Sequence, residues 1–116
     1  MSNNTQQDLL SAAQALLQEQ DDLGLAREVD HRFIETLTFS QADSIVSMLD
    51  EMLRTSFIEF PVWARNLAFR LAILQRPDDA ELLRRAAADL RCFGPDWDAQ
   101  ADRMIQKAES IANQGR

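Results

Sequence analysis

The chain has 116 residues, of which 46% are hydrophobic and 27% charged, and its formal net charge is −7. These values fit a single helical domain over residues 1–116 that buries a core without disulfides or metals. The negative charge disfavours nucleic-acid binding, because affinity for phosphate backbones comes mainly from lysine and arginine contacts.

Apolar residues at helical spacing predict three helices in the first half of the chain. The first ends before Asp21, Asp22 and Gly24, which interrupt the pattern. The third follows Ser40, which we interpret as its N-cap because a serine oxygen can accept from a free backbone N–H. The predicted inner faces are Leu9, Ala13, Leu16 and Leu17 in the first helix, Leu25, Val29, Phe33 and Leu37 in the second, and Ala42, Ile45, Val46, Leu49, Met52 and Leu53 in the third.

The fourth predicted helix starts at Pro61, a residue tolerated in a first helical turn, and runs to about residue 75. It is apolar over most of its circumference, so we expect it to be central, with Trp63 in the core. Its polar residues fall on one arc, which is formed by Arg65, Asn66 and Arg70.

A fifth helix is predicted to open at Pro77 and to end at Gly94, which suits a left-handed cap. The sixth helix follows Pro95, and the apolar spacing extends to residue 111. The predicted inner residues of these two helices are Leu82, Leu83, Ala86, Leu90 and Phe93, and then Trp97, Ala101, Met104, Ile105, Ala108 and Ile111. No alternating strand pattern competes, so we predict an all-α fold of about six amphipathic helices in antiparallel hairpins, packed as a compact bundle or a short solenoid-like stack.

The ends of the chain and its longest apolar stretch indicate where the protein resides. Residues 57–74 are interrupted by charged side chains such as Glu59 and Arg70, which argues against a membrane span. Residues 1–8 lack the basic start and apolar segment of a secretory signal, so we expect a cytoplasmic protein. Residues 1–7 are predicted to form a flexible tail, and residues 113–116 a frayed end.

The residue types that most enzymes require are nearly absent. Glu28 and His31 have the Glu-x-x-His spacing of di-iron proteins, but a di-metal centre needs a second copy and the chain has one histidine. Cys92 lies in an apolar run, far in sequence from that histidine, and we expect a buried thiol rather than a nucleophile. We therefore predict a non-enzymatic protein with no catalytic residue, no metal site and no cofactor.

Charge is distributed unequally along the chain. Residues 1–60 contain eleven acidic and three basic side chains, a balance of −8, whereas residues 61–116 contain eight and nine, a balance of +1. Such an acidic half is a solvated face or a docking surface for something basic. The predicted partner-binding residues are Asp21, Asp22, Glu28, Asp30, Asp50, Glu51 and Glu59, together with Trp97, an aromatic flanked by acids that either contacts a partner or packs in the core.

Residues 77–99 resemble a tetratricopeptide-type helical hairpin, with Pro77, Gly94 and Ala99 in roughly the expected order. The distance from Pro61 to Pro95, 34 residues, equals one such repeat, and heat-type repeats are similar in general form. This resemblance implies protein binding as a class. In overall style the short, acidic, arginine-over-lysine chain is also similar to small bacterial immunity proteins, which block a toxin.

Two functional hypotheses follow from these patterns. The first is an immunity or inhibitor protein whose acidic half blocks the basic surface of a toxin or another protein. The alternative is a helical-hairpin scaffold or adaptor that holds a peptide or partner helix in a groove. Both predict another protein as partner, with no nucleic acid and no membrane, and both leave open whether the chain forms a homo-oligomer.

Overall fold

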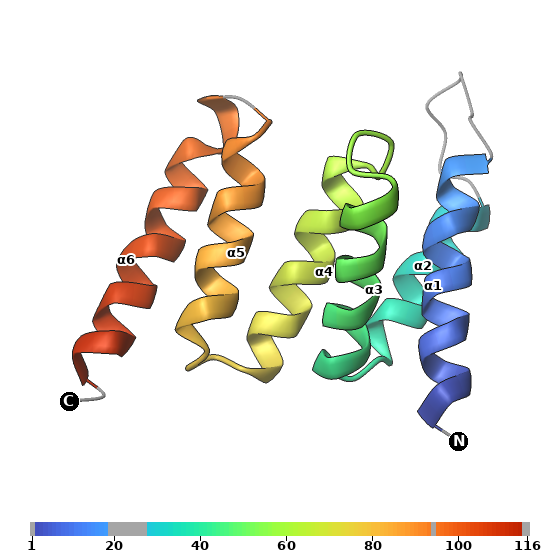
Figure 1. The fold of residues 1–116 in the computed structure, drawn as a ribbon, viewed down its shortest axis with the longest axis horizontal. Helices are drawn as coiled ribbons and strands as arrows, with labels where there is room; N and C mark the ends of the chain where they lie inside the picture. Colours follow the sequence, from blue (N-terminus) through green and yellow to red (C-terminus); the bar gives the residue numbers. More distant parts are fainter. Residues whose placement is uncertain (1, 19–27, 94, 115–116) are drawn as a thin grey trace. The chain divides into compact units, whose positions relative to one another are not determined.

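The computed structural model describes residues 2–18, 28–93 and 95–114, and it confirms the predicted all-α class. These residues form six α-helices and one short 3-10 helix, with no strand among them (Figure 1). The chain divides into two compact units, unit 1 (Met1–Ala72) and unit 2 (Ile73–Arg116). The helices are α1 (Ser2–Gln18), α2 (Glu28–Thr38), α3 (Ala42–Thr55), α4 (Val62–Gln75), α5 (Ala80–Arg91), η1 (Pro95–Trp97) and α6 (Asp98–Gln114).

Within unit 1, α1 packs against α2 and α3, and apolar side chains at helical spacing fill the space between them. Phe33 and Leu37, one turn apart on α2, are fully buried, as their spacing predicts. The predicted inner faces of α1 and α3 are also confirmed at most positions. The buried residues there are Leu9, Ala12, Ala13 and Leu16, and then Ala42, Ile45, Met48, Leu49 and Met52.

The helix starts in unit 1 differ in detail from the sequence pattern. Gln41, not Ser40, occupies the N-cap position of α3, and its side chain makes no capping hydrogen bond. The Ser40 hydroxyl is buried and donates to the Thr36 carbonyl oxygen at 2.7 Å, so it serves the end of α2 instead. α1 begins at Ser2, so the backbone of residues 2–7, which we predicted to be a tail, is helical.

α4 begins directly after Pro61, whose carbonyl oxygen accepts from the Arg65 backbone N–H at 3.1 Å. Proline is tolerated at a helix start because a backbone N–H there has no acceptor within the helix, so its absence costs no helical hydrogen bond. The helix buries mainly small residues together with one aromatic ring and one arginine: Ala64, Arg65, Ala68, Phe69 and Ala72.

Unit 2 is built on the pairing of α5 with α6, which run side by side in opposite directions (Figure 1). α5 starts later than Pro77 suggested, because Asp79 is its N-cap and the Asp79 carboxylate accepts from the Leu82 N–H at 3.0 Å. Leu90, Ala87 and Ala101 form a buried cluster between the two helices. Gly94, the predicted cap, lies outside the described residues.

Candidate protein-binding surface

The described acidic candidates all lie in unit 1. Glu28 and Asp30 occupy the first turn of α2, where the helix dipole favours negative charge. Asp50 lies on α3, and Glu59 lies in the connection between α3 and α4. Glu28, Asp50 and Glu59 are exposed, whereas Asp30 is half-buried. Asp21 and Asp22 lie outside the described residues.

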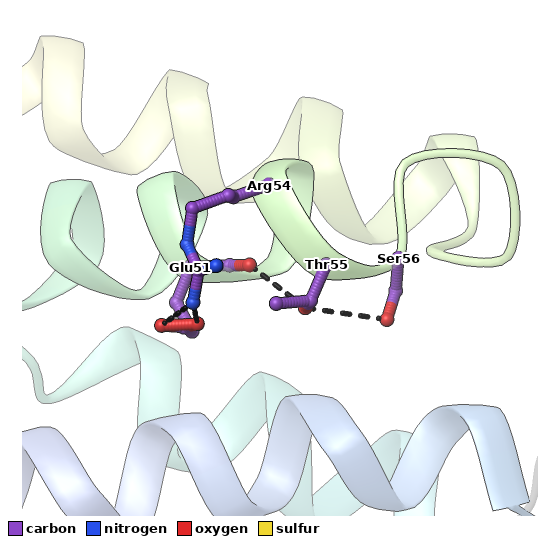
Figure 2. Close-up of polar contacts among 4 residues, drawn as sticks. All are labelled: Glu51, Arg54, Thr55 and Ser56. Atoms are coloured by element: carbon purple, nitrogen blue, oxygen red, sulfur yellow. Dashed lines mark hydrogen bonds and ion pairs between the residues drawn. The ribbon is translucent and has the colours of Figure 1, made fainter.

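Glu51 is neutralised by a neighbour on α3 (Figure 2). The Arg54 Nη2 atom donates to both Glu51 carboxylate oxygens, at 2.8 Å to Oε1. The arginine side chain is 70% exposed, and ion pairs three or four residues apart on a helix contribute only about 0.2–0.5 kcal/mol. The pair therefore stabilises α3 little, but it reduces the charge that Glu51 offers to a partner.

Two further acids extend the exposed acidic surface, although we did not select them from the sequence. Asp43 is exposed and lies seven residues before Asp50, so both share one stripe of α3. Glu35 is exposed and lies seven residues after Glu28, and these two share one stripe of α2. The spacing of two helical turns was the available signal for both residues.

Residues 56–61, which connect α3 to α4, form an ordered loop around a buried arginine. The Phe60 N–H donates to the Ser56 carbonyl oxygen at 2.9 Å, which closes the loop on itself. Arg65 Nη2 donates to the Phe57 carbonyl oxygen at 2.8 Å. The Arg65 guanidinium carbon lies 4.7 Å from the centroid of the Phe57 ring and 5.8 Å from that of Phe60. These distances are in the range of cation–π attraction.

The placement of Arg65 corrects the sequence interpretation. We assigned it to the polar arc of the fourth helix, yet its exposed fraction is 0%. Burying an arginine is tolerated when aromatic faces and a carbonyl oxygen replace part of its hydration. Phe57 and Phe60 supply these groups because the loop folds back over α4.

An aromatic cluster joins α2, the loop and α4 around Phe33. The Phe33 ring packs edge-on against Phe60 at 6.1 Å between centroids and against Trp63 at 5.8 Å. Phe60 is buried, but Trp63 is 40% exposed, so our prediction that it lies in the core is wrong in this respect. The indole contacts Phe33 with one part and leaves another part in water, an arrangement common at protein interfaces.

In the described part of unit 1, two large apolar side chains are about four-fifths exposed. Phe39 follows α2 and is 82% exposed, whereas Ile58 lies in the loop after α3 and is 80% exposed. They flank α3, which has 14 residues and is about 21 Å long. They are therefore separate features rather than one patch.

Trp97 belongs to unit 2, unlike the acidic candidates. It is half-buried and packs against the cluster formed by Ala87, Leu90 and Ala101. Of the two roles left open for this residue, the packing contact is the one that the structure describes.

Cys92 is exposed, which corrects the expectation of a buried thiol. It is the C-cap residue of α5, and its Sγ donates to the Ala88 carbonyl oxygen at 3.4 Å. In the apolar run around Cys92, Leu90 is the side chain that is buried.

Neither a metal cluster nor a membrane helix is found in the part of the chain that the structure describes. No group of three or more histidine, cysteine, aspartate or glutamate residues lies close enough there to hold a metal ion. His31 is exposed on α2. No helix over the same residues has both the length and the apolar character needed to cross a bilayer.

Comparison of the chain with protein-family models, with curated proteins and with solved structures gives no match. The resemblances to hairpin repeats and to immunity proteins stay predictions, carried by the sequence features described above.

Proposed function

We propose that the chain is a non-enzymatic protein-binding module of the immunity or inhibitor type, which blocks a basic surface of another protein such as a bacterial toxin. The observation that carries this proposal is the charge balance of −8 over residues 1–60, together with the exposure of Glu28, Asp50 and Glu59. Exposed carboxylates attract a basic surface over distances of about 10 Å at ordinary salt and guide the encounter.

The mechanism is occlusion rather than chemistry. Unit 1 has eleven acidic and five basic residues, a balance of −6, whereas unit 2 has eight and seven, a balance of −1. An acidic surface that covers a basic groove competes with the nucleic acid that such a groove binds, because both satisfy the same lysine and arginine side chains. Charge complementarity of this kind sets the association rate and excludes partners of like charge.

The test compares two triple charge reversals with the same change in net charge. In the first, Glu28, Asp50 and Glu59 in unit 1 are replaced by lysine; in the matched control, the exposed Asp96, Asp98 and Glu109 in unit 2 are replaced. Circular dichroism first establishes that both variants are folded. Each variant is then used to capture proteins from the native host at low and high salt, with mass spectrometry of the eluate.

We expect wild type and the unit 2 variant to capture a basic protein that salt releases. The unit 1 variant is expected to capture about tenfold less of that protein at low salt, or none. Equal capture by both variants, or binding that salt does not affect, would contradict the acidic-surface proposal.

A helical-hairpin scaffold or adaptor is the second candidate function. The pairing of α5 with α6 and the near-neutral charge of unit 2 favour it. This function predicts partner binding that is insensitive to salt and weakened by Arg84→Ala, a change at an exposed position of α5. The same capture at low and high salt therefore separates the two candidates.

A further inference from the structure

Several contacts hold the loop of residues 56–61, although it presents an exposed apolar side chain. The Phe60 N–H donates to the Ser56 carbonyl oxygen and closes the backbone of the loop. Arg65 holds Phe57 by donating to its carbonyl oxygen and by lying over its ring. Phe60 is buried against Phe33, and Pro61 restricts the backbone at the end of the loop. A loop fixed at both ends in this way loses little conformational entropy when a partner binds it.

Ile58 and Glu59 are the residues that this loop presents. Ile58 is 80% exposed, and Glu59 beside it is also exposed. Phe57 adds a second apolar residue with an exposed fraction of 37%. The apolar surface of an exposed isoleucine is in contact with water in the free chain. A partner that covers this surface removes it from water, which favours binding.

We infer that this loop is a preformed anchor for a basic amphipathic segment of the partner protein, an inference that rests on the proposed function. Apolar side chains of the segment cover Ile58 and the exposed part of Phe57, while a lysine or arginine pairs with Glu59. Charge favours a basic partner over a second copy of this chain. A second copy would place another unit 1, with its net charge of −6, against the first, and the two would repel. A basic segment is attracted to the acidic residues of unit 1.

The probe is a synthetic 14-residue peptide of leucine and lysine in helical periodicity, with a lysine peptide of equal charge as the charge-only reference. Binding is measured by calorimetric titration of the full chain. We expect Ile58→Ala to weaken binding of the leucine–lysine peptide about tenfold and to leave the lysine peptide unaffected. Glu59→Gln is expected to weaken both peptides and to lower their salt dependence.

Phe39→Ala and Leu74→Ala are the matched controls, because these side chains are 82% and 74% exposed and lie outside the loop. Both controls are expected to keep the wild-type affinity within about twofold. The inference is overturned if the wild-type chain does not bind the leucine–lysine peptide, or if Ile58→Ala weakens it no more than Phe39→Ala does. It is also overturned if sedimentation shows a dimer that Ile58→Ala dissociates, because the occupant would then be a second copy.

A double reversal, Glu28→Lys with Asp50→Lys, separates this inference from the proposed function because it leaves Glu59 of the loop unchanged. If the reversal abolishes binding of both peptides while Ile58→Ala changes neither, the acidic surface stands and the anchor fails. If the reversal changes neither peptide, the acidic-surface proposal itself fails.

Discussion

The two units bury different kinds of side chain. Among the described residues, unit 1 buries aromatic rings, methionines and other large side chains together with six alanines, whereas the buried hydrophobic residues of unit 2 are three leucines and four alanines. Because packing density is nearly constant in protein interiors, small buried side chains require helices to approach more closely. The large buried residues of unit 1 include Leu9, Phe33, Leu37, Ile45, Leu49, Met52, Phe60 and Phe69. All the buried hydrophobic residues described in unit 2 are Leu82, Leu83, Ala86, Ala87, Leu90, Ala101 and Ala108.

The units also differ in how they treat surface charge. In unit 2, Arg91 of α5 forms an ion pair with Asp102 of α6, and acidic and basic residues nearly balance. Unit 1 has an excess of six acidic charges, a balance that already counts Arg54, the partner of Glu51. Unit 2 therefore combines an ion pair between its helices with a nearly balanced charge, whereas unit 1 has a net acidic charge.

The largest expected effect comes from emptying the core of unit 1. Phe33→Ala removes a fully buried ring that contacts Phe60 and Trp63, and we expect a loss of about 3–5 kcal/mol in the free energy of unfolding. Urea denaturation followed by circular dichroism measures the change. The control Phe39→Ala truncates an exposed ring and is expected to stay within about 0.5 kcal/mol of wild type.

The same denaturation curves test the prediction of a single domain. If residues 1–116 unfold as one domain, Phe33→Ala shifts a single transition that includes both units. Two transitions, of which only one moves, would show that units 1 and 2 unfold independently.

A smaller effect is expected when a large side chain is introduced between the helices of unit 2. Ala101→Leu places extra volume in the cluster with Ala87 and Leu90, so overpacking is expected to cost about 1–3 kcal/mol. Ala112→Leu, at an exposed position of the same helix, is the control. Equal stability of the two variants in urea would show that α5 and α6 do not depend on small residues at their contact.

The smallest predicted effect tests the cap of α5. Asp79→Ala removes the carboxylate that accepts from the Leu82 N–H, and we expect a loss of about 1 kcal/mol. Asp78→Ala changes the adjacent exposed acid, which is not the capping residue, and is expected to leave the unfolding midpoint nearly unchanged. A cap at Asp78 instead would reverse the order of the two variants in thermal denaturation.

The helical class and most of the inner faces could be predicted because apolar spacing reports them directly. Phe33 and Leu37 are buried one turn apart, and Leu82 and Leu83 are buried on α5 as expected. Helix starts were less predictable, because several polar residues near each start offer a capping oxygen. Asp79 rather than Pro77 marks the start of α5 for this reason.

The burial of individual residues on α4 could not be read from the sequence. Arg65 was predicted on the polar arc but is buried, because the loop of residues 56–61 covers it. Trp63 was predicted in the core but is 40% exposed. Helical periodicity gives the direction of a side chain but not the segment that covers it. For the candidate surface, the neutralisation of Glu51 by Arg54 was predictable from their spacing of three residues, whereas the exposed Ile58 depends on the folded loop.

The position of the tryptophans makes the two units separately visible by fluorescence. The chain has two tryptophans and no tyrosine, with Trp63 in unit 1 and Trp97 in unit 2. Replacing either one by phenylalanine leaves a single indole whose emission follows the surroundings of one unit. Trp63, part exposed beside Phe33, then serves as a built-in reporter of events at the acidic unit, and Trp97 as its internal reference.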